Sequence, residues 1–385
     1  MDRKIRLGMV GGGPDAFIGA VHRKAAALDG HFDLVCGAFS RSYEKSKETG
    51  EALHLDSERV YESYDQMFEE ELKRPENERM DAVSIVTPNH VHFDPAKKAL
   101  ENGFHVIIDK PITFSLDEAK ELEELTKSTG RVLALTHTYT GYPMIKEAKH
   151  RIAAGQIGDL RKIYVEYPQG WLASSLENEG NKQASWRTDP EKSGAGGAIG
   201  DIGTHAANLA EYVSGLEITH LCADVRTTVE GRLLDDDSSA LLKFGEKVSG
   251  VLMATQVATG EENDLRIRLY GSIGGFEWTH TDPNTLLFKP HEEPAQILRA
   301  GTGYLTDLAA KNTRLPAGHP EGYLEAFANI YVEFATAVND HFNGSYKSAD
   351  DYDFPDAAEG VRGMAFVQNM LKSSGSDKKW TEFKV

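Results

Sequence analysis

Short apolar runs alternate with helix-like segments over the first third of the chain. Runs typical of buried strands occur at 5–10, 32–39, 81–86, 104–108 and 132–136. Helices are predicted between them, over 19–28, where apolar residues could form a packed face, over the polar stretch 43–53, over 94–102 and from Ser115 to about residue 128. Ser115 and Glu118 have the spacing of a capping box at the start of the last helix. This alternation predicts a doubly wound parallel sheet with helices on both faces.

The pattern changes after residue 136. Helices are predicted over 144–154, 200–214, 322–343 and 354–373, and strands over 162–167, 220–229, 239–244, 247–255 and 264–270. Gly245-Glu246 is typical of a hairpin turn between two of these strands. We therefore expect two domains, 1–136 and 137–385, the second an α/β domain with a large, open and mostly antiparallel sheet.

Three segments of the second domain give no regular pattern. Residues 169–197 are expected to be irregular, and 282–320, rich in Pro and Gly, to form an ordered excursion or lid. The run Asp235-Asp236-Asp237 is interpreted as a solvated loop.

Composition narrows the possible partners. The 385 residues are 40% apolar and 26% charged, and 60 acidic against 42 basic residues give a formal charge of −18. Such a charge repels nucleic acids and anionic membranes, so we expect neither as a partner. No secretory segment and no run of ~18 apolar residues is evident, which predicts a cytoplasmic protein. Cys36 lies within an apolar run and is expected to be a small buried hydrophobe.

A glycine turn follows the first predicted strand. Gly11 and Gly13 would let the backbone approach a pyrophosphate at the start of the next helix, where Phe17 and Ile18 lie. A tight structural turn would explain the same glycines. The next glycine, Gly19, comes three residues later than in the usual G-x-G-x-x-G pattern, so the details of phosphate contact are not fixed by the sequence. The position of this turn, opening a strand–helix–strand unit, favours dinucleotide binding.

The end of the second predicted strand bears on the choice between NAD and NADP. An acidic residue there would bind the ribose hydroxyls, but no Asp or Glu occurs between Leu34 and Tyr43. The strand ends instead in Ser40-Arg41, a hydroxyl and a guanidinium that could accommodate a 2′-phosphate. Arg41 could equally stack on adenine or point to solvent. NAD and NADP both stay open.

Two further motifs carry residues suited to proton and charge transfer. Lys110, at the end of a predicted strand, could stabilise an alkoxide, although a solvated surface lysine is the plainer alternative. Asp201 and His205 are four residues apart, so a helix would project both from one face. They suit proton abstraction from an alcohol. Asp201 could instead cap the helix while His205 sits in the core. With no third ligand at persuasive spacing, we expect no metal.

In their order and separation these motifs resemble the Gfo/Idh/MocA oxidoreductase family over essentially the whole chain. The matching segments are the glycine turn, Thr87-Pro88-Asn89-His90, Asp109-Lys110-Pro111 (usually Glu-Lys-Pro in the family), Gly200-Asp201-Ile202-Gly203-Thr204-His205 and Gly271-Ser272-Ile273-Gly274-Gly275. Trp186-Arg187 is similar to a pair in the family's levoglucosan and glycoside 3-dehydrogenases.

The resemblance implies a Rossmann domain followed by an α/β domain whose open sheet serves substrate binding and assembly into a dimer or tetramer. The implied cofactor, NAD or NADP, would be held by Gly11, Gly13, Phe17, Ile18, Ser40, Arg41, Thr87, Pro88, Asn89, His92, Asp109, Lys110, Trp186 and Arg187. The implied substrate site comprises Lys110, Tyr139, Trp171, Arg187, Asp201 and His205. Many members have Asn-Tyr-Arg where this chain has Thr138-Tyr139-Thr140, which favours a neutral sugar over a sugar phosphate, unless Arg187, Lys146 or Lys182 supplies a cation.

The implied activity is hydride transfer between a nicotinamide and a ring hydroxyl of a sugar, inositol or glycoside. His205 would act as the base, Asp201 would orient the substrate or the imidazole, and Lys110 would stabilise charge on oxygen. Two alternatives remain, an NAD-dependent glycoside hydrolase on the same fold and a non-catalytic sugar or dinucleotide sensor. The intact set of Lys110, Asp201 and His205 argues against the sensor.

Overall fold

The computed structural model describes residues 3–14 and 16–385, and the chain forms two compact units. The first comprises Met1–Thr138 together with Tyr323–Val361, and the second Tyr139–Gly322 together with Arg362–Val385. The chain thus leaves the first unit two residues after the predicted boundary. The chain also returns to the first unit over Tyr323–Val361, whereas the prediction assigned all residues after 136 to the second domain.

The first unit contains a five-stranded parallel sheet, as the alternation of strands and helices predicted. Its order is β2-β1-β3-β4-β5. The strands are β1 (Ile5–Gly11), β2 (Phe32–Ala38), β3 (Ala82–Val86), β4 (His105–Ile108) and β5 (Leu133–Leu135). Strand β2 lies on one side of β1 and the next strand, β3, on the other. Since β1 and β3 are parallel neighbours, their carboxyl ends lie side by side.

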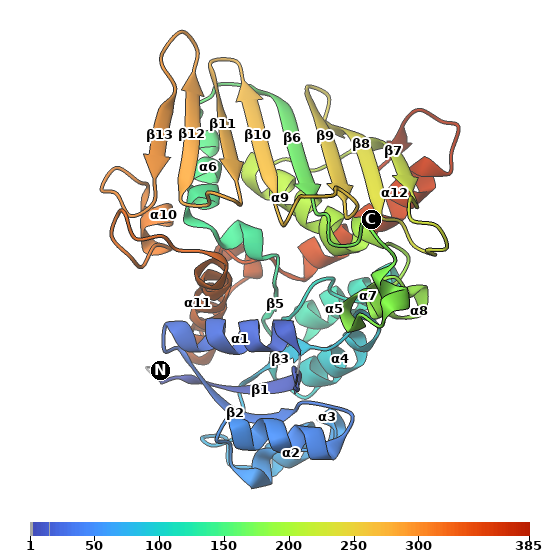
Figure 1. The fold of residues 1–385 in the computed structure, drawn as a ribbon. Coiled ribbons are helices and arrows are strands. Elements are labelled where there is room, and N and C mark those ends of the chain that lie inside the picture. The colour runs from blue at the N-terminus through green and yellow to red at the C-terminus, as the bar shows by residue number, and fades with distance from the viewer. Residues whose placement is uncertain (1–2, 15) are drawn as a thin grey trace. The chain divides into compact units, whose positions relative to one another are not determined.

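Helices of the same unit accompany this sheet. They include α1 (Phe17–Leu28), α2 (Tyr43–Ala52), α3 (Tyr64–Lys73), α4 (Phe93–Glu101), α5 (Leu116–Thr129) and α11 (Tyr323–Asn343). The capping box of Ser115 and Glu118 is present at the start of α5. The sequence did not predict α3. Helix α11 packs on α1 through an apolar stripe that includes Phe327 and Phe334, which explains why it belongs to the first unit (Figure 1).

The second unit contains a nine-stranded sheet of order β13-β12-β11-β10-β6-β9-β8-β7-β14. Its strands are β6 (Leu160–Pro168), β7 (His220–Arg226), β8 (Asp237–Phe244), β9 (Val248–Thr255), β10 (Arg266–Gly271), β11 (Gly274–Thr279), β12 (Thr285–Pro290), β13 (Gln296–Arg299) and β14 (Thr381–Glu382). All neighbours are antiparallel except β6 and β9. The predicted hairpin between β8 and β9 is confirmed. The predicted excursion over 282–320 was wrong in its first half, because β12 and β13 extend the sheet there.

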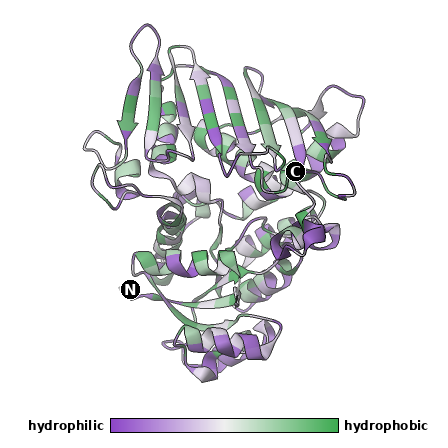
Figure 2. Cartoon of the chain, viewed as in Figure 1, coloured by the Kyte–Doolittle hydropathy of each residue, from purple (hydrophilic) through white to green (hydrophobic). Residues whose placement is uncertain are grey.

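Helices cover one face of this sheet. They include α6 (Pro143–Ala153) and α9 (Thr204–Ser214), with α10 (Asp307–Lys311) and the part of α12 (Ala357–Ser374) that belongs to this unit. Two short helices, α7 (Lys182–Arg187) and α8 (Pro190–Ser193), interrupt the segment predicted to be irregular. Along β8, Ala240, Leu242 and Phe244 are buried while Leu241 is 45% exposed. Figure 2 shows hydrophobic and hydrophilic residues interspersed along the strands of this sheet.

Among the described residues, no helix combines the length and apolar character needed to cross a bilayer. Cys36 is fully buried, as predicted from its apolar surroundings.

Candidate active site

The glycine turn after β1 brings the backbone of three segments together. Gly11 and Gly12 have φ of 85° and 75°, in the left-handed region that favours glycine. The amide of Gly13 donates to the Phe39 carbonyl at 3.1 Å, and a Cβ on Gly13 would lie 2.8 Å from that oxygen. A side chain at position 13 would therefore push the turn away from the end of β2.

Gly19 completes the turn despite its late position in the sequence. A Cβ on Gly19 would lie 2.3 Å from the Cα of Gly12, so only glycine allows α1 to pack this closely on the turn. Arg23, one turn further along α1, donates from Nη1 to the Gly12 carbonyl at 2.7 Å. The longer spacing thus lengthens the loop between Gly13 and α1 without removing the helix-packing glycine.

The start of α1 is suited to an anionic group. Its N-cap residue, Ala16, makes no side-chain hydrogen bond to the helix, and the first turn of the described helix contains no acidic residue. Phe17 is 67% exposed at this end, and Ile18 is half-buried. Across the turn, Thr87 Oγ1 is buried without a hydrogen-bond partner among the described residues. The glycine cradle, the open helix end and this unsatisfied hydroxyl together fit a dinucleotide.

The segment after β2 leaves the choice of nucleotide open. The Ser40 amide donates to Ser46 Oγ at 3.0 Å, and Ser40 Oγ accepts from the Ser42 amide at 3.2 Å. Arg41 is exposed. The hydroxyl therefore shapes the turn, while the guanidinium projects from it.

His92 joins the Thr87 loop to the Lys-Pro motif. Its ring is fully buried, with Nδ1 2.7 Å from the Pro111 carbonyl oxygen and Nε2 2.8 Å from that of Thr87. Both ring nitrogens face backbone carbonyls, so His92 ties these two segments together, and its predicted place in the cofactor site stays a prediction. In the same loop Asn89 is buried and Pro88 exposed, while Lys110 is half-buried.

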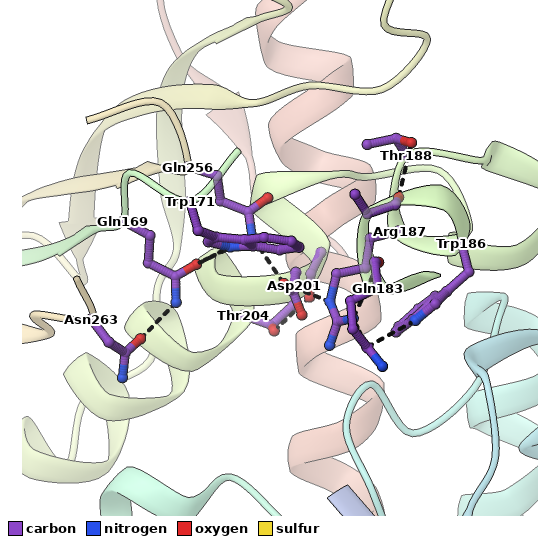
Figure 3. Close-up of polar contacts among 12 residues, drawn as sticks. Gln169, Trp171, Gln183, Trp186, Arg187, Thr188, Asp201, Thr204, Gln256 and Asn263 are labelled. Atoms are coloured by element: carbon purple, nitrogen blue, oxygen red, sulfur yellow. Dashed lines mark hydrogen bonds and ion pairs between the residues drawn. The ribbon is translucent and has the colours of Figure 1, made fainter. Parts of the chain in front are cut away.

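In the second unit, Asp201 is the centre of a polar network (Figure 3). Its Oδ2 accepts from Gln256 Nε2 at 2.9 Å and lies 3.3 Å from Arg187 Nε. Asp201 lies in a single π-helical turn, Ile199–Gly203, directly before α9.

That turn is held by Asp235, which was wrongly interpreted as part of a solvated loop. The Asp235 carboxylate accepts from the amides of Gly197 at 2.6 Å and Ile199 at 2.8 Å. Asp236 is also buried and pairs with Arg232 at 3.0 Å. These carboxylates bind backbone amides and an arginine of their own unit, which a run of charges does not reveal in a sequence.

Amide side chains that the sequence analysis missed extend the network. Gln169 Oε1 accepts from Gln256 Nε2 at 3.3 Å and from Trp171 Nε1 at 3.0 Å, and Gln169 Nε2 donates to Asn263 at 2.6 Å. Gln169 and Gln256 directly follow β6 and β9. Because these strands are the parallel pair of the sheet, their carboxyl ends meet. The only sequence signal for this pair was that a polar residue, Gln169 or Gln256, directly follows each of these strands.

His205 lies beside a cluster of tyrosines. The imidazole is buried, and the ring of Tyr139 meets it edge-on at 5.0 Å. The Tyr139 hydroxyl makes a very short bond to that of Tyr167 and accepts from Asn263 Nδ2 at 3.2 Å. Burial raises the pKa of Tyr139, so this phenol keeps its proton.

Arg187 is held flat between aromatic rings. Its guanidinium lies 4.2 Å from the centre of the Trp186 ring and 5.8 Å from that of Trp171. Nη1 also donates to Gln183 at 2.6 Å. With Asp201 as its counter-charge, Arg187 adds no net positive charge to the network.

The structure thus brings the expected residues together in two sets. Tyr139, Trp171, Trp186, Arg187, Asp201 and His205 belong to the second unit. The glycine turn, Thr87 and Lys110 belong to the first.

Comparisons with known proteins place the chain in a family. Residues 5–137 match the oxidoreductase family with an NAD-binding Rossmann fold, and residues 145–277 match the Gfo/Idh/MocA C-terminal domain. The chain belongs to the Gfo/Idh/MocA family. It is an oxidoreductase with an NAD-binding Rossmann domain, as the motifs predicted.

Several family members resemble the chain over its full length. The uncharacterized oxidoreductase YfiI of Bacillus subtilis is 33% identical over 387 residues, covering 100% of this chain and 98% of that protein. An inositol dehydrogenase homolog from Azotobacter vinelandii, solved with NAD+, is 34% identical with a TM-score of 0.95, covering 100% and 98%. An oxidoreductase from Sinorhizobium meliloti is 44% identical with a TM-score of 0.87, covering 99% and 100%.

Proposed function

We propose that this protein transfers a hydride between a nicotinamide dinucleotide and a ring carbinol of a neutral cyclic polyol or sugar. The observation that carries the proposal is the network around Asp201 and His205. It presents amide and indole groups from Gln169, Gln256 and Trp171, which suit hydroxyl groups, while Arg187 is paired with Asp201. The homolog from Azotobacter vinelandii has also been solved with NADH and myo-inositol.

The roles of the side chains follow from their chemistry. A bound nicotinamide supplies the acceptor for the hydride that leaves the carbinol carbon. His205 takes the proton of the hydroxyl as the carbon–oxygen double bond forms. Asp201, fixed by Arg187 and Gln256, accepts a hydrogen bond from a substrate hydroxyl and orients the ring. Lys110 stabilises the negative charge that develops on the oxygen.

The cofactor residues follow from the first unit. The amides at the start of α1 and the glycine turn would hold the pyrophosphate, with Phe17, Ile18 and the Thr87 loop beside it. Ser40 and Arg41 would face the adenosine ribose, so that NADP is accepted as well as NAD. Trp186 and Arg187 would lie near the nicotinamide.

A panel of inositols, sugars and glycosides, each with NAD and with NADP, tests the proposal at the nicotinamide absorbance. We expect reduction with neutral cyclic substrates and little with the matching sugar phosphates. Absence of turnover with every neutral substrate would contradict the proposal. Release of an aryl group from a glycoside without net NADH would instead identify the glycoside hydrolase alternative.

The proposal includes assembly through the uncovered face of the nine-stranded sheet, as a dimer or tetramer. Among the described residues of the second unit, no helix lies on that face. A location in the cytoplasm stays a prediction from the sequence.

A further inference from the structure

A buried chain of polar side chains lies behind Lys110 in the first unit. His22, on α1, is fully buried, and its Nδ1 lies 2.8 Å from the Tyr331 hydroxyl on α11 and 3.2 Å from Ser84 Oγ on β3. Its other ring nitrogen, Nε2, faces Asp109, the residue after β4, at 3.6 Å from Oδ1, and has no hydrogen-bond partner among the described residues. The proposed reaction uses none of the side chains of His22, Ser84 and Tyr331.

The partners of His22 determine where its proton lies. An ionised carboxylate can only accept, so Nε2 carries the proton and directs it toward Asp109. Nδ1 then accepts from a hydroxyl. Burial raises the pKa of Tyr331, so its phenol keeps the proton that it can donate to Nδ1.

The order of hydroxyl, imidazole and carboxylate is that of a hydrolytic triad, but it cannot act as one. Ser84 is fully buried and Tyr331 is 1% exposed, so no substrate reaches either hydroxyl. The chain of contacts must therefore act on another group of the protein.

Asp109 is the end of the chain that reaches the site. Its side chain is 15% exposed, and its Oδ1 also accepts from Thr136 Oγ1 at 2.8 Å. Burial alone would raise the pKa of Asp109, but the contact with His22 and the nearby charges hold it below its ordinary value. The titratable groups that act on or respond to this carboxylate are His22, His92, Lys110, His137 and Tyr331.

We propose that His22 is a positioning residue that acts on Lys110 through Asp109. By directing its Nε2 proton at Asp109 from 3.6 Å, His22 keeps this carboxylate ionised and oriented, and the ionised carboxylate in turn holds the neighbouring ammonium in place for the reaction. The inference rests on the proposed function, since it assumes that Lys110 faces the developing alkoxide.

The test compares two replacements of His22. Phenylalanine fills the volume of the ring but donates nothing, whereas glutamine retains an N–H donor that can reach Asp109. For His22→Phe we expect kcat to fall by about 10-fold or more, while the rising limb assigned to His205 stays in place. His22→Gln should restore most of the rate. Dinucleotide affinity should stay within a few-fold of wild type in both.

The same comparison in an Asp109→Asn background tests whether His22 acts through this carboxylate. Without a carboxylate at position 109, His22→Phe should no longer lower kcat. Equal losses of rate in both backgrounds, or a His22→Phe rate equal to that of wild type, would overturn the proposal. A loss of rate that glutamine does not rescue would mean that the ring acts only through packing.

A readout without turnover separates this proposal from the proposed function. Because its folded-state pKa is lowered, Asp109 adds stability that is present above its ordinary pKa of 3.8 and lost as pH falls through the lowered value. In His22→Phe this loss should begin at higher pH in thermal unfolding, whether or not any polyol is oxidised. An unchanged pH dependence of unfolding would overturn the role of His22, while failure of polyol oxidation alone would count only against the proposed function.

Discussion

At the scale of single residues, the two halves of the proposed site differ in what holds each group. Asp201 is fixed by an arginine and a glutamine, and His205 by the rings packed around it. Lys110 instead follows the carboxylate of Asp109 on a different unit. Replacing each group should therefore give a distinct kinetic signature.

For the lysine, we expect Lys110→Ala to reduce kcat by roughly 100-fold or more, because an ammonium aimed at the developing alkoxide acts mainly in the transition state. Dinucleotide affinity should change by only a few-fold. Steady-state kinetics beside a fluorescence titration with the dinucleotide measures both. If affinity collapses while turnover survives, Lys110 is a cofactor ligand instead.

For the histidine, oxidation should rise with pH as the imidazole loses its proton, since only the neutral form can act as a base. His205→Asn should remove this rising limb together with most of the activity. The pH profile of kcat/KM for the variant and the wild type, with dinucleotide binding measured separately, checks the assignment. A His205→Asn enzyme with a wild-type profile and rate would show that another group is the base.

At the scale of elements, the turn before α9 depends on one buried carboxylate outside it. Burial raises the pKa of Asp235 from 3.8 to about 6, although two backbone amides oppose the shift. A raised pKa means that the folded state prefers the protonated acid. Stability is therefore fully present below pH 3.8 and is lost as pH rises through about 6.

Asp235→Asn should not share this loss, because its amide does not ionise. Between pH 4.5 and pH 7.5, the melting temperature of wild type should fall relative to that of the variant, by the equivalent of about 2 kcal/mol. Differential scanning calorimetry at both pH values measures the difference. Parallel pH dependence of the two proteins would show that Asp235 is ionised without cost.

The contrast between predicted and unpredicted elements has a physical basis. The strands of the first unit are short continuous apolar runs, several of them next to glycine turns. Their pattern could therefore be recognised in the sequence, and it predicted a parallel sheet. By contrast β11, β12 and β13 are half-exposed strands, and their mixed pattern was hidden among Pro and Gly.

The candidate site shows the same division. Lys110, Asp201 and His205 stand in local motifs and could be predicted from them. Gln169 and Gln256 become neighbours only because β6 pairs in parallel with β9, across about 85 residues of sequence. No local pattern encodes that pairing, so these amides were missed.

At the scale of the whole molecule, the uncovered face of the nine-stranded sheet is the surface that most requires an explanation. Cys222, Leu241, Val251 and Tyr164 stand opposite one another on four adjacent strands and form an exposed or half-exposed row across it. Such a continuous, largely apolar row favours a second copy of the chain as the partner, since a twofold arrangement would bury the same row twice.

We therefore expect Leu241→Asp to shift the protein to a smaller assembly, measured by size-exclusion chromatography with light scattering. Leu241 is 45% exposed, so the charge should not disturb the fold of the subunit, but at an interface it would be buried without a partner. Leu233→Asp is the matched control, because that leucine is 76% exposed in the loop between β7 and β8, outside the sheet. The far-ultraviolet circular dichroism and melting temperature of both variants establish that each is folded.

If wild type is a monomer at the working concentration, or if both leucine variants keep its mass, the sheet face is not the interface. A loss of mass confined to Leu241→Asp, with dinucleotide binding intact, would assign assembly to the sheet and leave the nucleotide site of each subunit independent of it.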